Sequence, residues 1–144
     1  MANTNALKDI ERYVRHWCSS KYGTEIEDYE KKIQLVTGSV HRFDVVAKDG
    51  SIIAGIKTSA LRIDGKVSTG VIKSTFTELY FLSLISAPKK LMILTDKGYY
   101  EYFRKISNGK VADGIEIIHC PLPKEIEKDI AIVHRNCREE IGKK

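Results

Sequence analysis

The stretch FDVVAKDGSIIAGIK, residues 43–57, contains the pattern that decides the fold. Its two apolar runs flank the dipeptide Asp49-Gly50, which is among the strongest sequence signals for a two-residue β-hairpin loop. With that loop, Lys48 lies directly opposite Ser51, and the register of the whole hairpin follows by counting outward. The stretch therefore predicts two antiparallel strands joined by a tight turn.

This register gathers the polar side chains of the hairpin on one face. Counting outward from the turn places Asp44 opposite Gly55. Two residues further out, Arg42 lies opposite Lys57. Side chains alternate between the two faces of a strand, so these residues share one face of the hairpin. The other face is continuously apolar and consists of Phe43, Val45, Ile52, Ala54 and Ile56. An acid and a lysine are thus predicted side by side on a stiff hairpin.

The surrounding sequence extends the hairpin into an α/β domain. Gly38-Ser39 suits a second two-residue hairpin loop, which makes residues 30–57 a three-strand antiparallel meander. Residues 5–20 predict a helix, and residues 70–86, apolar nearly all round, predict a helix that is largely enclosed. The elements expected after it are a buried parallel strand over 90–95, a short helix over 98–106, a strand over 114–120 and an amphipathic C-terminal helix beyond Pro123. Short turns join these elements, so all 144 residues are expected to form one domain.

Two acids interrupt apolar helix surfaces. Glu11 falls inside the apolar stripe of its helix, and Glu78 is the only acid of the helix over 70–86. A carboxylate among apolar residues costs free energy unless a partner compensates it. For Glu11 two interpretations stay open: its side chain reaches solvent at the edge of the stripe, or it is directed at a metal or at Lys57. For Glu78 we expect either a partner or a function.

The composition excludes several classes of protein. An apolar fraction of 42% and a charged fraction of 30% are typical of a soluble globular domain. The 3 cysteines form no CxxC motif, which argues against a disulfide framework. The longest nearly uncharged apolar run is too short to span a bilayer, and the N-terminal residues lack the apolar core of a secretory signal, so we expect a cytoplasmic protein with no membrane partner. The net charge of +5 favours an anionic partner, with nucleic acid first.

The chain resembles the PD-(D/E)XK nuclease superfamily, which has the restriction-endonuclease-like fold. The resemblance lies in the order helix, three-strand meander, helix, strand, and in the stretch FDVVAKDGSIIAGIK. The pattern of that superfamily is an acid on the second strand, followed on the third strand by an acid, any residue and a lysine. Asp44 matches the first acid and Lys57 matches the lysine. Many members add a glutamate on the first helix, a place that Glu11 fits.

The chain departs from this pattern at Gly55, where the superfamily has its second acid. In some members that acid has moved to the helix after the third strand, and Glu78 lies on the corresponding helix here. The alternative is a degenerate site that has lost cleavage. We favour a working or ancestrally working nuclease, because a discarded site has no reason to keep several buried charges, which cost stability unless they are paired.

The resemblance implies a metal-dependent reaction with Mg²⁺ as the cofactor, or Mn²⁺ in its place. Asp44 would be the central metal ligand and the carbonyl of Ile56 another, with Glu11 or Glu78 completing the shell directly or through water. Lys57 would position the attacking water and stabilise the developing negative charge. The catalytic set implied is therefore Asp44, Lys57, Glu11 and Glu78.

The expected partner is DNA, and restriction, homing and junction or repair roles all stay open. Candidate contacts to the DNA backbone are Arg42, Thr58, Ser59, Arg62, Lys66 and Lys73. A homodimer or higher assembly is expected, because two sites are needed to cut both strands of a duplex. The rival interpretation is a catalytically inactive nucleic-acid-binding or assembly module on the same fold. The aromatic residues Tyr99, Tyr100, Tyr102 and Phe103 are interpreted as core, with base stacking as the alternative.

Overall fold

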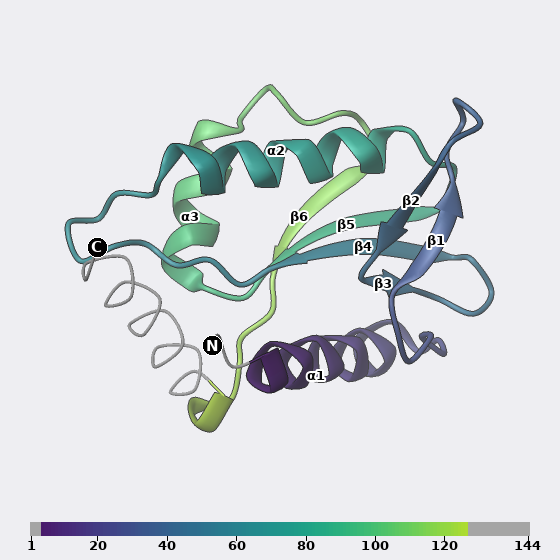
Figure 1. The fold of residues 1–144 in the computed structure, drawn as a ribbon, viewed down its shortest axis with the longest axis horizontal. Helices are drawn as coiled ribbons and strands as arrows, with labels where there is room; N and C mark the ends of the chain where they lie inside the picture. The colour runs from purple at the N-terminus through teal and green to yellow at the C-terminus, as the bar shows by residue number, and fades with distance from the viewer. Residues whose placement is uncertain (1–3, 127–144) are drawn as a thin grey trace.

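A computed structural model describes residues 4–126, which form three layers with a β-sheet between helices (Figure 1). This arrangement confirms the predicted α/β class. The elements in chain order are α1 (Thr4–Tyr22), β1 (Lys31–Gln34), β2 (Val40–Phe43), β3 (Val45–Val46), β4 (Ile52–Lys57), α2 (Thr69–Ser83), β5 (Lys89–Leu94), α3 (Lys97–Ile106) and β6 (Ile115–His119). The C-terminal helix expected beyond Pro123 falls largely outside the described residues.

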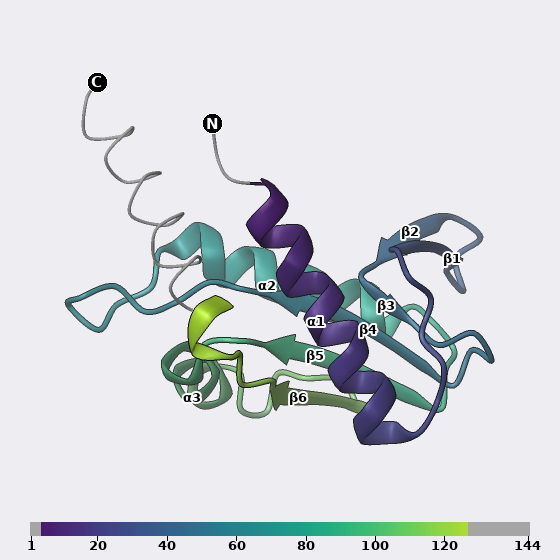
Figure 2. The same cartoon turned by 90° about the horizontal axis from the view of Figure 1, so that it is seen from below.

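The main sheet has the strand order β3-β4-β5-β6. Strands β3 and β4 are antiparallel, whereas β5 lies parallel to both β4 and β6. This confirms the prediction of a buried parallel strand here, since an uninterrupted apolar run such as β5 is typical of a strand between parallel neighbours. Strands β1 and β2 pair only with each other and form a two-stranded ribbon beside the main sheet (Figures 1 and 2).

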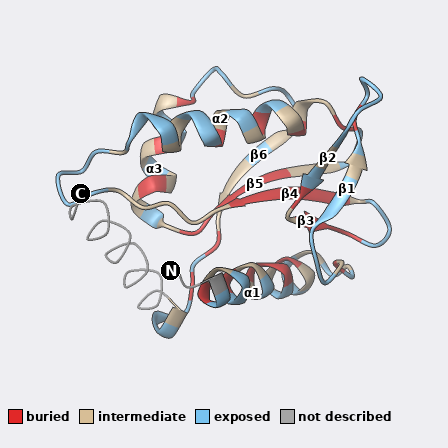
Figure 3. Cartoon of the chain, in the orientation of Figure 1, coloured by how far each residue is buried: buried red, intermediate tan, exposed pale blue. Residues whose placement is uncertain are grey.

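The two faces of the main sheet have separate cores. Helix α1 covers one face, and α2 and α3 cover the other (Figure 2). Figure 3 shows that burial is most complete along β4 and β5, between these helices. In the second core Tyr99 and Phe103 of α3 are fully buried, which confirms the interpretation of these two aromatics as core.

The Asp49-Gly50 turn has the predicted register but a different loop. Val46 lies opposite Ile53, as counted from the sequence. The loop nevertheless comprises the four residues Lys48–Ser51 and not the two predicted. Within this wider turn, Gly50 N–H donates to the Ala47 carbonyl at 2.9 Å. The Asp49 carboxylate accepts hydrogen bonds from both the amide and the hydroxyl of Ser51, which holds that amide in the wider loop. This interaction of the Asp49 side chain with the backbone two residues further on, an Asx turn, explains why the loop is wider than predicted.

The expected three-strand meander is broken at Asp44, and this corrects two predictions. Arg42 does not lie opposite Lys57. Its register partner is Lys32 of β1, and its guanidinium donates to Glu30 at 3.1 Å. Phe43 does not share a face with Val45 but packs in the core on the α2 side. The physical reason is the bend between β2 and β3, which lets β2 leave β4 and pair with β1.

The loop of the ribbon also differs from the prediction. The expected two-residue turn at Gly38-Ser39 is a three-residue loop, Val36–Gly38, closed by a hydrogen bond from Leu35 N–H to the Ser39 carbonyl at 2.8 Å. Gly38 has a φ of 95°, in the left-handed region that glycine tolerates best. A three-residue loop with glycine in this conformation is the next commonest hairpin connection.

Helix α2 is less enclosed than its apolar sequence predicts. Its N-cap is Ser68, as expected, with the Ser68 hydroxyl accepting from the amide of Val71. Only Thr75, Leu79 and Leu82 of the helix are buried, and Tyr80 is 58% exposed. The prediction of a largely enclosed helix is wrong because α2 forms an outer layer over one face of the sheet (Figure 1). Within residues 4–126, no helix is both long enough and apolar enough to cross a membrane.

Candidate active site

Asp44 occupies the point where the sheet edge is broken, and hydrogen bonds hold both its side chain and its backbone. Its Oδ2 accepts from the amide of Ile56 at 2.8 Å, on the β4 strand. Its backbone carbonyl accepts from Arg15 Nε of α1 at 2.8 Å. Because β2 has turned away, the carboxylate takes the place of a ladder partner at this edge. The bend therefore holds Asp44 against β4 through Oδ2, and its other carboxylate oxygen takes no part in the hydrogen bond to Ile56.

The same hydrogen bond defines the direction of the Ile56 carbonyl. The N–H and C=O of one strand residue point toward the same edge, so the carbonyl of Ile56 also faces the side of Asp44. The carbonyl of the adjacent residue Lys57 faces the other edge, where it accepts a hydrogen bond from Thr95 N–H at 3.1 Å. The structure thus brings Ile56 and Asp44 together, as the sequence analysis expected.

Glu78 fills the space that the missing side chain of Gly55 leaves. A Cβ atom built on Gly55 would lie 2.6 Å from Glu78 Cγ and 2.9 Å from Glu78 Oε1, both closer than real contacts allow. The Glu78 side chain is 13% exposed. The Glu78 side chain in this conformation therefore leaves no room for a side chain at position 55, and the helix acid lies where the strand acid would otherwise project.

His41 contacts Glu78 from the ribbon, and the sequence analysis did not identify it. Its Nε2 lies 3.3 Å from Glu78 Oε2. The only available signal was the alternation of β2, which places His41 on the same face as Phe43, two residues away. That signal could not be used, since the direction of this face depends on the bend at Asp44.

Glu11 lies at the rim of the site. Its carboxylate is 3.6 Å from Arg15 Nη2, one turn along α1, and its side chain is 38% exposed. The side chain reaches solvent, as the first interpretation holds, and burial together with the nearby charge of Asp44 raises its pKa. A direction toward a metal or toward Lys57 stays a prediction. A cavity of about 460 Å³ opens beside it, lined in part by Arg12 and Glu30.

The charge of Asp44 raises the pKa of both Glu11 and Glu78. Burial raises the pKa of Asp44, and the charge of Glu30 raises it further, against the hydrogen bond from Ile56 and the charge of Lys57. Burial also raises the pKa of Glu78, and the Asp44 charge adds to this effect, against the nearby His41. For Glu11, burial and then the Asp44 charge raise the pKa. Crowded carboxylates with raised pKa values favour a proton or a cation between them.

Lys57 completes the cluster on the α2 side of β4. Its Nζ donates to the hydroxyl of Ser74 on α2 at 2.9 Å. Its positive charge lowers the pKa of both Asp44 and Glu78, which places it within electrostatic reach of both acids. The ammonium of Lys57 is directed toward α2, and its placement side by side with Asp44 stays a prediction.

The residues proposed for DNA contact are distributed over the ribbon, the loop after β4 and helix α2. Arg62 and Lys66 lie in the loop beyond the carboxyl end of β4 (Figure 1), and the Arg62 guanidinium contacts Asp64 at 3.2 Å. Thr58 and Ser59 begin this loop, and Lys73 lies on the first turns of α2. Arg42 is on the ribbon with its side chain bound to Glu30. Their positions leave the DNA contacts a prediction.

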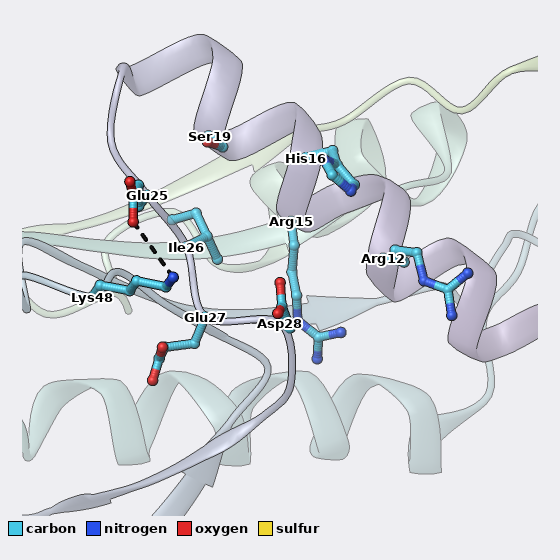
Figure 4. Close-up of a pocket in the computed structure, with 9 residues that line it drawn as sticks. All are labelled: Arg12, Arg15, His16, Ser19, Glu25, Ile26, Glu27, Asp28 and Lys48. Atoms are coloured by element: carbon cyan, nitrogen blue, oxygen red, sulfur yellow. Dashed lines mark ion pairs between the residues drawn. The ribbon is translucent and has the colours of Figure 1, made fainter.

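A cavity of about 290 Å³ lies between α1 and residues 25–28 (Figure 4). Figure 4 shows Arg15 of α1 pointing toward Asp28, and Lys48 paired with Glu25 at 3.4 Å. The acidic and basic residues that line the cavity are balanced in number, so its walls offer no net charge that would attract a phosphate. We assign it no ligand.

The donor set at Asp44 suits Mg²⁺. In the described part of the chain, no three acid, histidine or cysteine side chains form a ready metal cage. Mg²⁺ does not require one, because it is commonly held by one or two carboxylates together with water and substrate phosphate oxygens. Asp44 and Glu78 supply hard oxygen donors, and the space over Gly55 admits the second of them. The residues present therefore fit this ion.

Comparisons with known proteins assign no family. No family model matches the chain, and no curated protein matches it. Among solved structures, the chain is similar to AF1548, described as a protein of unknown function, with a TM-score of 0.49 and 14% identity. The match covers 83% of this chain and 61% of AF1548, so the chain spans less than two thirds of that protein. A likeness at this level carries no argument about fold family or function.

Proposed function

We propose that the chain is a metal-dependent DNA endonuclease with a restriction-endonuclease-like fold, related to the PD-(D/E)XK superfamily. The observation that supports this best is the packing of Glu78 over Gly55, next to Asp44. It answers the main objection to the sequence resemblance, the missing strand acid, because another carboxylate lies at that point. In this proposal residues 1–144 form one nuclease domain.

The proposed chemistry assigns one task to each residue. Mg²⁺, when bound, supplies a Lewis acid that polarises the phosphate and lowers the pKa of a bound water. Asp44 and Glu78 hold the ion, the carbonyl of Ile56 faces the same edge, and Glu11 at the rim contributes through water. Lys57 orients the attacking water and stabilises negative charge on the phosphate.

The proposed substrate is duplex DNA, cut on both strands by two copies of the chain. The loop after β4 and the exposed Lys73 and Arg42 would contact the phosphate backbone. Two-fold pairing of copies follows from the need for two sites, one for each strand.

Nicking of supercoiled plasmid tests the proposal. The purified protein is incubated with plasmid and Mg²⁺ or Mn²⁺, beside Lys57→Ala and the matched control Lys110→Ala, an exposed lysine after α3. We expect the wild type and the control to nick the plasmid, and Lys57→Ala to lose roughly 10²–10⁴-fold in rate, the range for a general acid–base group. Equal nicking by Lys57→Ala and wild type would identify a contaminating nuclease and contradict the assignment.

A second candidate function is a nucleic-acid-binding module without catalysis. Gly55 favours it, because the strand acid of the superfamily pattern is absent. The two candidates differ in the same experiment. Retarded migration of DNA in a gel without any nicking, in both metals, would support the module and exclude the enzyme.

A further inference from the structure

His41 directs its imidazole at Glu78 from an element that lies outside the main sheet. Its Nε2 is 3.3 Å from Glu78 Oε2, and the two side chains are 24% and 13% exposed. The pair is therefore largely shielded from water, where a hydrogen bond to a carboxylate is stronger than at the surface.

Two aromatic rings fix the orientation of the imidazole. It stacks on Phe81 with ring centroids 3.9 Å apart and an interplanar angle of 8°, and it meets Phe43 edge-on at 4.8 Å and 74°. Phe81 follows Glu78 by one turn of α2, and Phe43 immediately precedes Asp44. The slot that holds His41 is therefore built from the same two segments that carry the acids.

The two oxygens of Glu78 have different surroundings. Oε1 lies over the backbone of Gly55, at 2.9 Å from where a Cβ atom would be, whereas Oε2 faces His41. A glutamate on a helix has three side-chain torsions and loses rotamer freedom when it is fixed. A hydrogen bond to Oε2 from a ring that packs against Phe43 and Phe81 restricts these torsions and keeps Oε1 above β4.

We propose that His41 is a positioning residue, which holds Glu78 so that Oε1 faces the metal-binding edge beside Asp44. This inference rests on the proposed nuclease function and adds a residue that neither the sequence pattern nor the metal ligands include. Partners that orient a metal ligand typically change metal affinity or activity by roughly 10–100-fold when they are removed.

Three variants of the full chain test the role. His41→Phe keeps a ring for stacking but has no hydrogen-bond donor, and His41→Gln restores a donor close to the position of Nε2. His119→Phe, on β6 beside Tyr100, is the matched control. For each, we would measure the Kd of Mn²⁺ by titration calorimetry, kcat and KM for plasmid nicking, and the melting temperature.

We expect His41→Phe to weaken Mn²⁺ binding and to lower kcat, each by roughly 10–100-fold, with KM for DNA unchanged. His41→Gln should recover most of both values, and His119→Phe should match the wild type. Wild-type metal binding and cutting that persist in His41→Phe would overturn the role of His41 alone. A loss shared by His41→Phe and His41→Gln together with a lowered melting temperature would also overturn it, since His41 would then be a packing residue. A wild type that neither binds Mn²⁺ nor nicks DNA would overturn the proposed function and this inference with it.

Discussion

Helices α1 and α2 cover opposite faces of one sheet, and each brings a single carboxylate to Asp44 under different constraints. Glu11 of α1 is 38% exposed and has its cation, Arg15, one turn away on the same helix. Glu78 of α2 is 13% exposed, and its partner His41 comes from the ribbon, 37 residues away in sequence. The charge of an exposed acid can be balanced by a cation of its own helix. A buried acid on an apolar helix needs a partner that only the tertiary structure brings to it. In the proposed nuclease we therefore assign the inner, directly acting role to Glu78 and the outer role to Glu11.

The largest expected effect distinguishes these two acids by activity. Glu78→Gln should lower the rate of Mg²⁺-dependent nicking by roughly 10²–10³-fold, because it removes a charge next to Asp44. Glu11→Gln should lower it by about 10-fold or less, as expected of a group that acts through water. Plasmid nicking by both variants at equal protein concentration measures the ratio. Equal losses, or a larger loss for Glu11→Gln, would reverse the inner and outer assignments.

A smaller effect distinguishes the same acids by stability. Burial raises the pKa of Glu78 above its ordinary value of 4.5, so between the two values the folded chain holds more protons than the unfolded chain. Stability therefore falls as the pH rises through this window, and the cost is complete above it. Glu78→Gln removes the cost. In metal-free buffer at pH 8 it should melt roughly 2–4 °C above the wild type, the shift that ~1 kcal/mol produces in a chain of this size.

The control for this prediction is the pH itself. Well below pH 4.5 the wild-type carboxyl is protonated in both states, so the advantage of Glu78→Gln should vanish there. Glu11→Gln should show a smaller gain at pH 8, because its side chain is more exposed and solvent screens its charge. Melting curves at the two pH values measure this difference in stability. A Glu78→Gln variant that is less stable than wild type at pH 8 would contradict the claim that the buried Glu78 charge destabilises the fold.

The parts of the site that depend on local sequence were predictable. The Asp49-Gly50 turn and strand alternation placed Asp44 near Gly55, and helical spacing singled out Glu11 and Glu78 as acids on apolar surfaces. The resemblance to a superfamily pointed to Glu78 as an acid on the helix after the third strand, and in the structure its side chain occupies the space over Gly55.

The parts that depend on the bend at Asp44 were not predictable from pattern. Alternation assumes an unbroken strand, so it placed Arg42 opposite Lys57 and Phe43 beside Val45, and both positions are wrong. The bend is stabilised by Arg15 from a distant helix, and no local signal identifies that hydrogen bond. His41 was missed for the same reason, because only the bend turns its face of β2 toward α2.

The central claim is that an acid on helix α2 replaces the acid that the strand lacks, and exchanging the two positions tests it most directly. A Gly55→Glu change alone would collide with Glu78, since its Cβ atom would lie 2.6 Å from Glu78 Cγ, so it must be combined with Glu78→Ala. We expect Glu78→Ala to lose Mg²⁺-dependent nicking and the double variant, Gly55→Glu with Glu78→Ala, to regain at least about a tenth of the wild-type rate. A folded double variant that stays as inactive as Glu78→Ala, or a Glu78→Ala protein that cuts at the wild-type rate, would contradict the claim.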